Sequence, residues 1–248
     1  MRLPGATQVV VNKGAPYRLA VPFRWTLHSI ECPPARSVLS LIADAKTHPH
    51  PPHFWVSMPN RVIVQCIDTA ISAEALAHPA GTVETNHARA IQVEIAGYAK
   101  DFGGYPDEWF TWLRDALLIP IARHHQIDLN NIPEFLPYPD SYGNNGVRFA
   151  GADWLSFDGL CGHQHVPAND HGDPGAVPTH LLKPPPTPSP GDDEMTPEQE
   201  AKLDEILRQV AGTSTKPKTG WPRALRSVVG GDGKSSIWER CGEILKRV

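Results

Sequence analysis

The densest polar segment of this 248-residue chain runs from Gly162 to Gly175 and reads GHQHVPANDHGDPG. It holds three histidines and two aspartates within eleven residues, from His163 to Asp173. Imidazole nitrogens and carboxylate oxygens are ligands that Zn²⁺ binds in tetrahedral sites. The segment is therefore a candidate metal site, and the alternative is a polar surface loop with a Pro-Gly turn. The spacing alone does not decide which of its side chains point inward.

The hydrophobic pattern predicts an α/β domain in which strands and helices alternate. Helical spacing runs from Pro34 to Ala45 and again over Asp107–His125, where Pro120 is expected to kink the helix. A long irregular loop, rich in Tyr, Asn and Gly, follows over Leu136–Asp153. Strands are predicted over Thr7–Val11, Phe23–Ser29, Phe54–Val56, Arg61–Ile67, Ala90–Ile95 and Gly159–Gly162.

The composition excludes several classes of protein. Hydrophobic residues make up 40% and charged residues 20%, which is normal for a globular chain. The formal net charge of -4 provides no general basic field, so we expect no nucleic-acid partner. No apolar run approaches the roughly 20 residues that cross a bilayer, so we expect no membrane insertion. The four cysteines form no Cys-x-x-Cys pair, which favours a reducing cytosol over a disulfide scaffold.

A proline-rich segment divides the chain. Five of the eight residues from Lys183 to Pro190 are proline, and such a stretch favours extended polyproline II, a semi-rigid spacer. We therefore predict a large domain over residues 1–182, a linker over 183–194 and a small tail over 195–248.

The segment that closes the large domain resembles the closing motif of the zinc-dependent N-acetylmuramoyl-L-alanine amidases. These form the type-2 amidase family, whose fold is shared with peptidoglycan recognition proteins. The family motif is Gly-His, a short loop, a catalytic basic residue and Asp-Pro-Gly. Further family landmarks stand here in the family order: His28 at the end of an early strand, His53 before an aromatic residue, His78 to Gly81, Asn86, and Ile91 to Glu94. The resemblance covers about residues 9–182 and implies a mixed central β-sheet flanked by helices.

This resemblance implies a role for each of five side chains. His28, His163 and Asp173 would be the zinc ligands, which leaves one tetrahedral position for water, as in catalytic zinc sites. Glu94 would accept a proton from that water and pass it to the leaving amine. The spacing before Glu94 is one residue longer than in the family. His171 stands where many relatives have lysine, and it would stabilise the oxyanion.

Other histidines compete for the metal. His165 lies two residues after His163, so on an extended strand both would face one way, and His-x-His is a zinc-binding pattern. The family has a non-ligand at this position, which favours a supporting role for His165. His48, His50 and His53 form a second cluster, but the prolines between them scatter their directions. We interpret them as loop residues, with His53 as a candidate to line the cleft.

The resemblance implies a hydrolase that binds Zn²⁺ and cleaves the amide between N-acetylmuramic acid and L-alanine in bacterial peptidoglycan. The first residues lack the apolar core of a secretory signal. With its linker and tail, the chain resembles a bacteriophage endolysin, held in the host cytoplasm until a holin releases it to the cell wall. The alternatives are a non-catalytic muropeptide-binding module of this fold and a cytosolic wall-recycling amidase. The complete ligand set argues against the first, and the linker and tail argue against the second.

The tail has two candidate roles. Capping boxes at Thr196 and Ser236 each precede apolar residues at helical spacing, so two short amphipathic helices are expected. Residues 216–248 carry eight Lys and Arg against three Asp and Glu. A basic face favours anionic wall polymers through charge attraction that salt weakens. Alternatively, two helices that are too few to bury a core pair with a second copy of the chain as a homo-oligomer.

Overall fold

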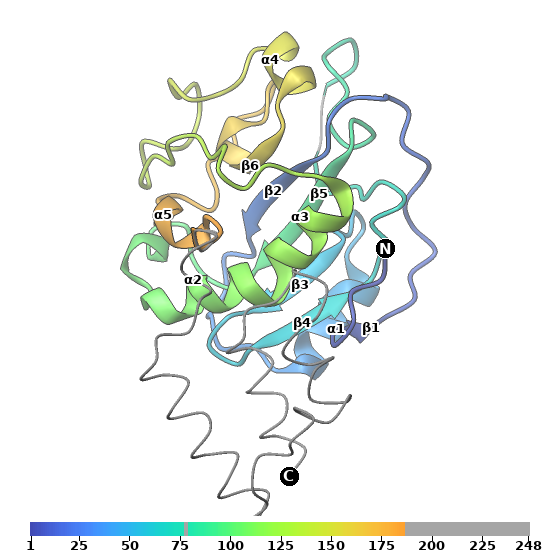
Figure 1. The fold of residues 1–248 in the computed structure, drawn as a ribbon, viewed down its shortest axis with the longest axis vertical. Coiled ribbons are helices and arrows are strands. Elements are labelled where there is room, and N and C mark those ends of the chain that lie inside the picture. Colours follow the sequence, from blue (N-terminus) through green and yellow to red (C-terminus); the bar gives the residue numbers. More distant parts are fainter. Residues whose placement is uncertain (77–78, 187–248) are drawn as a thin grey trace, which may run out of the picture. The chain divides into compact units, whose positions relative to one another are not determined.

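Six strands form one mixed β-sheet in the part of the chain that the computed structural model describes, residues 1–76 and 79–186 (Figure 1). Their order is β1-β4-β3-β5-β2-β6, and only β3 and β4 are antiparallel among these neighbours. The strands are β1 (Thr7–Gln8), β2 (Arg24–Ser29), β3 (Phe54–Ser57), β4 (Val62–Gln65), β5 (Ala90–Ile95) and β6 (Gly159–Gly162). The predicted α/β class is confirmed.

The chain folds into one compact unit over Met1–Pro184. The last part of the predicted linker and the whole tail lie outside the described residues, so the division into domains stays a prediction. In the described ranges, no helix has the length and apolar character needed to cross a membrane.

The first strand is shorter than predicted. The expectation was Thr7–Val11, but β1 ends at Gln8. Val9 still donates its N–H to the carbonyl of Gln65 at 2.8 Å, and then the chain leaves the sheet edge, where Val10 is 83% exposed. Beta propensity alone therefore overestimated the length of this strand, because only part of the segment has a neighbouring strand to pair with.

The first helix starts later than the sequence pattern suggested. Helix α1 (Val38–Thr47) begins after Ser37, whose side chain accepts a hydrogen bond from the N–H of Ser40. This cap satisfies one of the free N–H groups of the first turn, so the helix begins here and not at Pro34. The helix buries Leu41 and Ala45 against one face of the sheet.

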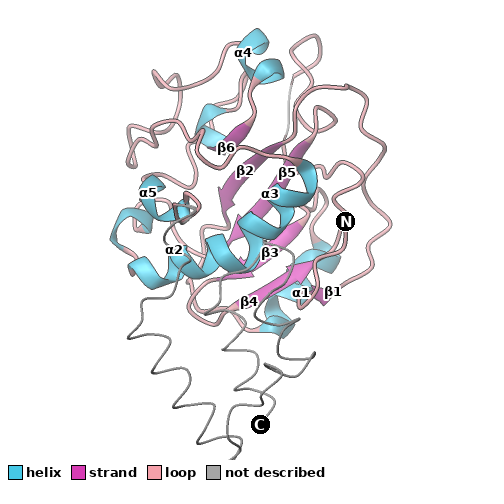
Figure 2. Ribbon diagram, viewed as in Figure 1, coloured by secondary structure: helices cyan, strands magenta, loops and turns pink. Residues whose placement is uncertain are grey.

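The opposite face is covered by one long helical segment (Figure 2). It comprises α2 (Asp107–Leu113), a π-helical turn over Arg114–Leu118 and α3 (Ile119–His125). Pro120 has no N–H to continue the α-helical ladder, and the expected irregularity takes the form of the π turn just before it. Phe110, Leu117 and Ile121 of this segment join Trp25, Leu27, Ile91 and Val93 of the sheet in the main core.

Alternation along the central strands determines which side chains reach the functional face. Because Trp25 and Leu27 of β2 are packed against the long helical segment, His28 emerges on the other face. The same alternation on β5 buries Val93 in that core and turns Glu94 to the face of His28. All six residues of β2 are buried, as expected for a central strand with both faces covered.

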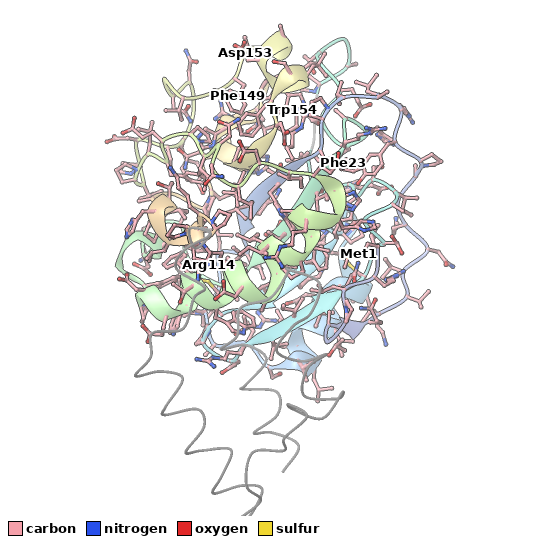
Figure 3. The ribbon with its side chains drawn as sticks, viewed as in Figure 1. Met1, Phe23, Arg114, Phe149, Asp153 and Trp154 are labelled. Atoms are coloured by element: carbon pink, nitrogen blue, oxygen red, sulfur yellow. The ribbon has the colours of Figure 1, made fainter. Side chains whose placement is uncertain are left out.

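The long loop predicted over Leu136–Asp153 ends at Ala150, because helix α4 (Gly151–Ser156) follows directly. Trp154 of this helix is fully buried, and the guanidinium of Arg24 lies 4.6 Å from its ring centroid and donates to its carbonyl. Phe149 and Trp154 are labelled near α4 in Figure 3. The described fold ends with a one-turn helix α5 (Thr179–Leu182), held by a hydrogen bond from Arg114 to the carbonyl of Leu181.

Candidate metal centre and its cleft

Two neighbouring parallel strands bring the first two candidate ligands together. His28 is near the end of β2, and His163 directly follows the end of β6. Leu27 of β2 is paired with Gly162 of β6 in the sheet register, and the residue that follows each of them is a histidine. The two imidazole rings are 4.6 Å apart between centroids. Residues 135 positions apart therefore meet at one sheet edge, as the carboxyl ends of parallel strands do.

Asp173 completes a buried group of three. One carboxylate oxygen, Oδ1, lies 3.2 Å from Nδ1 of His163, and the other, Oδ2, lies 3.5 Å from Nδ1 of His28. Oδ2 also accepts a hydrogen bond from the N–H of Ser29 at 3.1 Å, which fixes the carboxylate beside the end of β2. One ligand atom from each of His28, His163 and Asp173 lies within 4.8 Å of the others.

The donor set of this group fits a zinc ion. Two imidazole nitrogens and one carboxylate oxygen are the ligands of catalytic zinc sites that keep a fourth position open. The donor atoms also converge, because Nδ1 of His28 and Nδ1 of His163 each face one oxygen of the Asp173 carboxylate.

The pKa shifts of His163 and Asp173 also suit ligation, which requires neutral imidazole and ionised carboxylate. Burial lowers the pKa of His163 to about 4. Burial alone would raise the pKa of Asp173, but the adjacent His163 and His28 outweigh it and hold this pKa below its usual range. For His28, burial is outweighed by Glu94 and Asp173, which raise its pKa. A cation bound between His28, Glu94 and Asp173 would take the place of the proton that these carboxylates favour on His28.

Glu94 lies beside the group on the next strand. It is the register partner of His28 across β5 and β2, and its Oε1 is 3.9 Å from Nδ1 of His28. Burial raises the pKa of Glu94 to about 7. Its other oxygen, Oε2, is buried without a hydrogen-bond partner in the described part of the chain. A carboxyl group with a pKa near neutrality can both accept and return a proton, which is the requirement for general acid–base catalysis.

His171 lies over the group from the loop that precedes Asp173. Its ring is stacked on that of His163, with centroids 4.6 Å apart and an interplanar angle of 15°. Its Nδ1 is 3.8 Å from Oδ1 of Asp173, and its side chain is 62% exposed. The structure thus brings all five predicted site residues to one place, three as a potential ligand set and two beside it.

The two competing histidines have other partners. In His165, Nδ1 accepts the N–H of Gly162 at 3.0 Å, and Nε2 contacts the carbonyl of Glu134 at 2.8 Å. In His53, Nδ1 accepts the N–H of Gln92 at 3.0 Å, and Nε2 contacts a backbone carbonyl at 2.9 Å. Burial lowers the pKa of both side chains to about 4. Both rings fit the neutral form with a proton on Nε2, and neither has a nitrogen left for a metal.

His165→Ala is therefore expected to lower the free energy of unfolding without affecting zinc binding by the candidate ligand group. The substitution removes the partner of the buried Gly162 N–H, at a cost of about 1–3 kcal/mol, and the contact with the carbonyl of the exposed residue Glu134. Urea unfolding and zinc content per chain measure the two effects separately. Loss of zinc from a folded His165→Ala protein, with zinc kept by His28→Ala, would show that this ring and not His28 is a ligand.

A cleft of about 870 Å³ opens over the candidate metal centre. The prediction that His53 lines it is wrong, because this ring lies fully buried in the hydrogen bonds described above. His48 and His50 line the cleft instead. The proline-separated spacing did not indicate which histidine faces the cleft. The other lining residues are His28, Ser29, Ile30, Glu31, Trp55, Glu74, Ala75, Leu76, Asn86, His87, Glu94, Tyr142, His163, Asn169, His171 and Asp173.

Of the remaining motif landmarks, Asn86 lines this cleft. Asn86 holds the chain beside it: its Oδ1 accepts the N–H of Leu76 at 2.9 Å and the side-chain amide of Gln92 at 3.0 Å. Gly81 has a positive φ of 83°, which suits glycine in the turn there. His78 lies outside the described residues.

Sequence reasoning missed two residues that connect the site to the loop before α4. Arg148 donates to the carbonyls of Val166 at 2.7 Å and His171 at 3.0 Å, and so ties that loop to the segment that carries Asp173. Tyr142 reaches the cleft from the same loop. The Tyr-, Asn- and Gly-rich composition predicted an irregular loop here, but no spacing signal distinguished these residues.

Comparison of the sequence with family models and with curated proteins gives no match. Among solved structures, the chain is similar to one described as the "crystal structure of Se-Met AmpD derivative". The two share 17% sequence identity, and the match covers 73% of this chain and 94% of that chain with a TM-score of 0.43.

Proposed function

We propose that this protein is a zinc-dependent amidase that hydrolyses the bond between N-acetylmuramic acid and L-alanine in bacterial peptidoglycan. The observation that carries the proposal is the buried group of His28, His163 and Asp173, with the Glu94 carboxylate adjacent to it at the floor of a cleft. The resemblance of the Gly162–Gly175 segment to the type-2 amidase motif supports the choice of substrate.

His28, His163 and Asp173 would hold the ion. A zinc ion bound there supplies Lewis acidity, which polarises a carbonyl and lowers the pKa of a water to about 7. The backbone around the site constrains the positions of all three side chains. Asp173 is oriented by the N–H of Ser29, and the two histidines are fixed by the ends of neighbouring strands. Such preorganisation keeps the cost of assembling the site small.

Glu94 would move the proton. It takes a proton from the attacking water while the water oxygen bonds to the carbonyl carbon and the π electron pair moves to the carbonyl oxygen. When that pair returns, the carbon–nitrogen bond breaks and Glu94 gives the proton to the leaving nitrogen. The products are the lactyl carboxylate and a free L-alanine amino group. His171 would donate a hydrogen bond to the carbonyl oxygen while it carries negative charge.

The test is digestion of purified peptidoglycan, with His163→Ala as the matched control. We expect the wild-type protein to release L-alanine amino termini without new reducing sugars, as measured by mass spectrometry and reducing-end assays. Metal analysis of the same protein is expected to give one zinc per chain. New reducing ends without amino termini would identify a glycosidase and refute the proposal. Tight wall binding by zinc-loaded protein that cuts no bond would identify a binding module instead.

We infer a phage endolysin as the setting of this activity, with release to the cell wall through a holin. The inference is supported by the proline-rich segment from Lys183 and by the basic residues of 216–248. A linker and a basic segment suit an enzyme that is held on an anionic wall polymer. Salt-dependent retention of the full chain on whole walls tests this role, and retention that salt does not weaken would contradict it.

A further inference from the structure

One wall of the cleft is made by two loops that are fastened to each other. The N–H of Gly143 donates to the carbonyl of Asp170 at 2.8 Å. The guanidinium of Arg148 bridges the carbonyls of Gly143 and His171, at 2.9 and 3.0 Å. The loop before α4 is thus positioned by the same segment that carries His171 and Asp173.

Tyr142 is seated where these loops meet. A Cβ atom on Gly172 would overlap both the ring and the backbone nitrogen of Tyr142, so the absence of a side chain at Gly172 lets the ring lie against the chain there. Gly172 directly precedes Asp173, the carboxylate of the candidate metal group. The ring of Tyr142 also lines the cleft together with His171 and Asp173. Its place beside the reacting centre is therefore set by close packing.

The hydroxyl of Tyr142 is available as a donor, whereas two other polar side chains that line the cleft donate to partners within the protein. Ser29, which lines the cleft, donates its hydroxyl to Glu31 at 2.5 Å. The Asn169 side-chain amide donates to the carbonyl of Val166 at 2.7 Å. The Tyr142 hydroxyl makes no hydrogen bond to another described residue.

Acyl transfer through a tetrahedral intermediate places negative charge on the former carbonyl oxygen. Fixed donors aimed at that oxygen are usually the largest single contribution to the rate. His171, 62% exposed, is one candidate donor in this cleft. A carboxylate cannot serve, because it has no hydrogen to donate when ionised. Tyr142 adds a neutral donor on the wall that carries His171 and Asp173.

We propose that the Tyr142 hydroxyl donates a hydrogen bond to the oxyanion of the tetrahedral intermediate and so acts with His171 as a catalytic residue. The assignment rests on the proposed amidase function and adds a residue to it. The hydroxyl keeps its proton throughout, and only the strength of its hydrogen bond changes as the oxygen gains charge.

The experiment compares Tyr142→Phe with Tyr138→Phe in the full chain. We expect Tyr142→Phe to lower kcat on a soluble muropeptide by about 10²–10³-fold, with KM, zinc content and unfolding midpoint close to wild type. Phenylalanine keeps the ring against Gly172 and removes only the hydroxyl. Tyr138 is an edge-to-face neighbour of Tyr142, is 52% exposed and does not line the cleft, so its variant is expected to keep wild-type kinetics.

A binding measurement separates catalysis from folding. The probe is a muramoyl peptide in which a tetrahedral phosphinate replaces the scissile amide. Tyr142→Phe is expected to weaken binding of this probe by a factor similar to its loss in kcat, and to bind the uncleaved amide normally in a Glu94→Gln background.

Two results would overturn the assignment. A Tyr142→Phe enzyme with wild-type kcat and wild-type affinity for the phosphinate would overturn it while the amidase function stands. A wild-type protein that releases no alanine amino termini would overturn the function, and the Tyr142 assignment with it.

Discussion

On the proposed function, replacement of His163 by alanine is expected to abolish zinc binding and to slow amide hydrolysis by about 10³-fold or more. The substitution leaves one imidazole and one carboxylate, which are too few to hold a catalytic zinc. The ion contributes several kcal/mol to stabilisation of the transition state, and each 1.36 kcal/mol is a factor of ten in rate. His28→Ala and Asp173→Ala are expected to have the same effect, because the three ligand atoms form one group.

Zinc content per chain and the rate on a soluble muropeptide measure this prediction together. His180→Ala is the matched control, since His180 is an exposed histidine of α5. Circular dichroism checks that each variant is folded. A folded His28→Ala protein that retains one zinc and full activity would show that the ligand set is wrong.

Glu94→Gln is expected to reduce the rate by about 10²–10⁴-fold while zinc stays bound. Glutamine has nearly the same shape as glutamate but cannot accept the proton of the attacking water. Zinc is retained because Glu94 is not one of the three ligands, although its carboxylate lies 3.9 Å from Nδ1 of His28. This combination of lost rate and kept metal distinguishes the proton acceptor from a ligand.

The same kinetic and metal assays apply to Glu94→Gln, with Glu108→Gln as the control. Glu108 is an exposed carboxylate in the first turn of α2 and lies outside the cleft lining. We expect Glu108→Gln to match wild type in both measurements. Loss of zinc from Glu94→Gln would place this residue among the ligands. A wild-type rate with zinc bound would remove it from catalysis.

Most of the framework of the site could be read along the chain. The alternation over Ala90–Ile95 and over Phe23–Ser29 predicted the two central strands, which the structure has as β5 and β2. The apolar side of each strand is buried, so the polar residues on the other side, including His28 and Glu94, had to share a face. Burial of a whole sheet face is a strong constraint, because a shift of one residue would expose every apolar side chain.

The ends of helices and strands were predicted less well, because several neighbouring residues can each start or end the same element. Ser37 caps α1, although Pro34 also suits a helix start. The helix begins after Ser37 because the side chain of this serine accepts a hydrogen bond from an N–H of the first turn. Likewise, the effect of Pro120 appeared as a π turn in the preceding residues, since a missing N–H disturbs the ladder toward its N-terminal side.

The roles of the surplus histidines depended on contacts that are distant in sequence. His163, His165 and His171 lie in one segment of nine residues, and residue type cannot rank them as ligands. In the folded protein, both ring nitrogens of His165 contact backbone groups, one of them the carbonyl of Glu134, 31 residues away. His163 faces Asp173 instead. His53 is taken out of the cleft in the same way, by the N–H of Gln92.

The sequence by itself determined the kinds of group available at this site and the strands that carry them. Residue type decides which atoms can bind a cation or move a proton, and apolar periodicity decides which face of a strand is buried. Only the tertiary structure decided which groups meet. Sheet register brings His28 and Glu94 side by side, and close packing of Gly172 places Tyr142 beside Asp173. Contacts between distant segments depend on packing of the whole domain, and no local pattern in the chain encodes them.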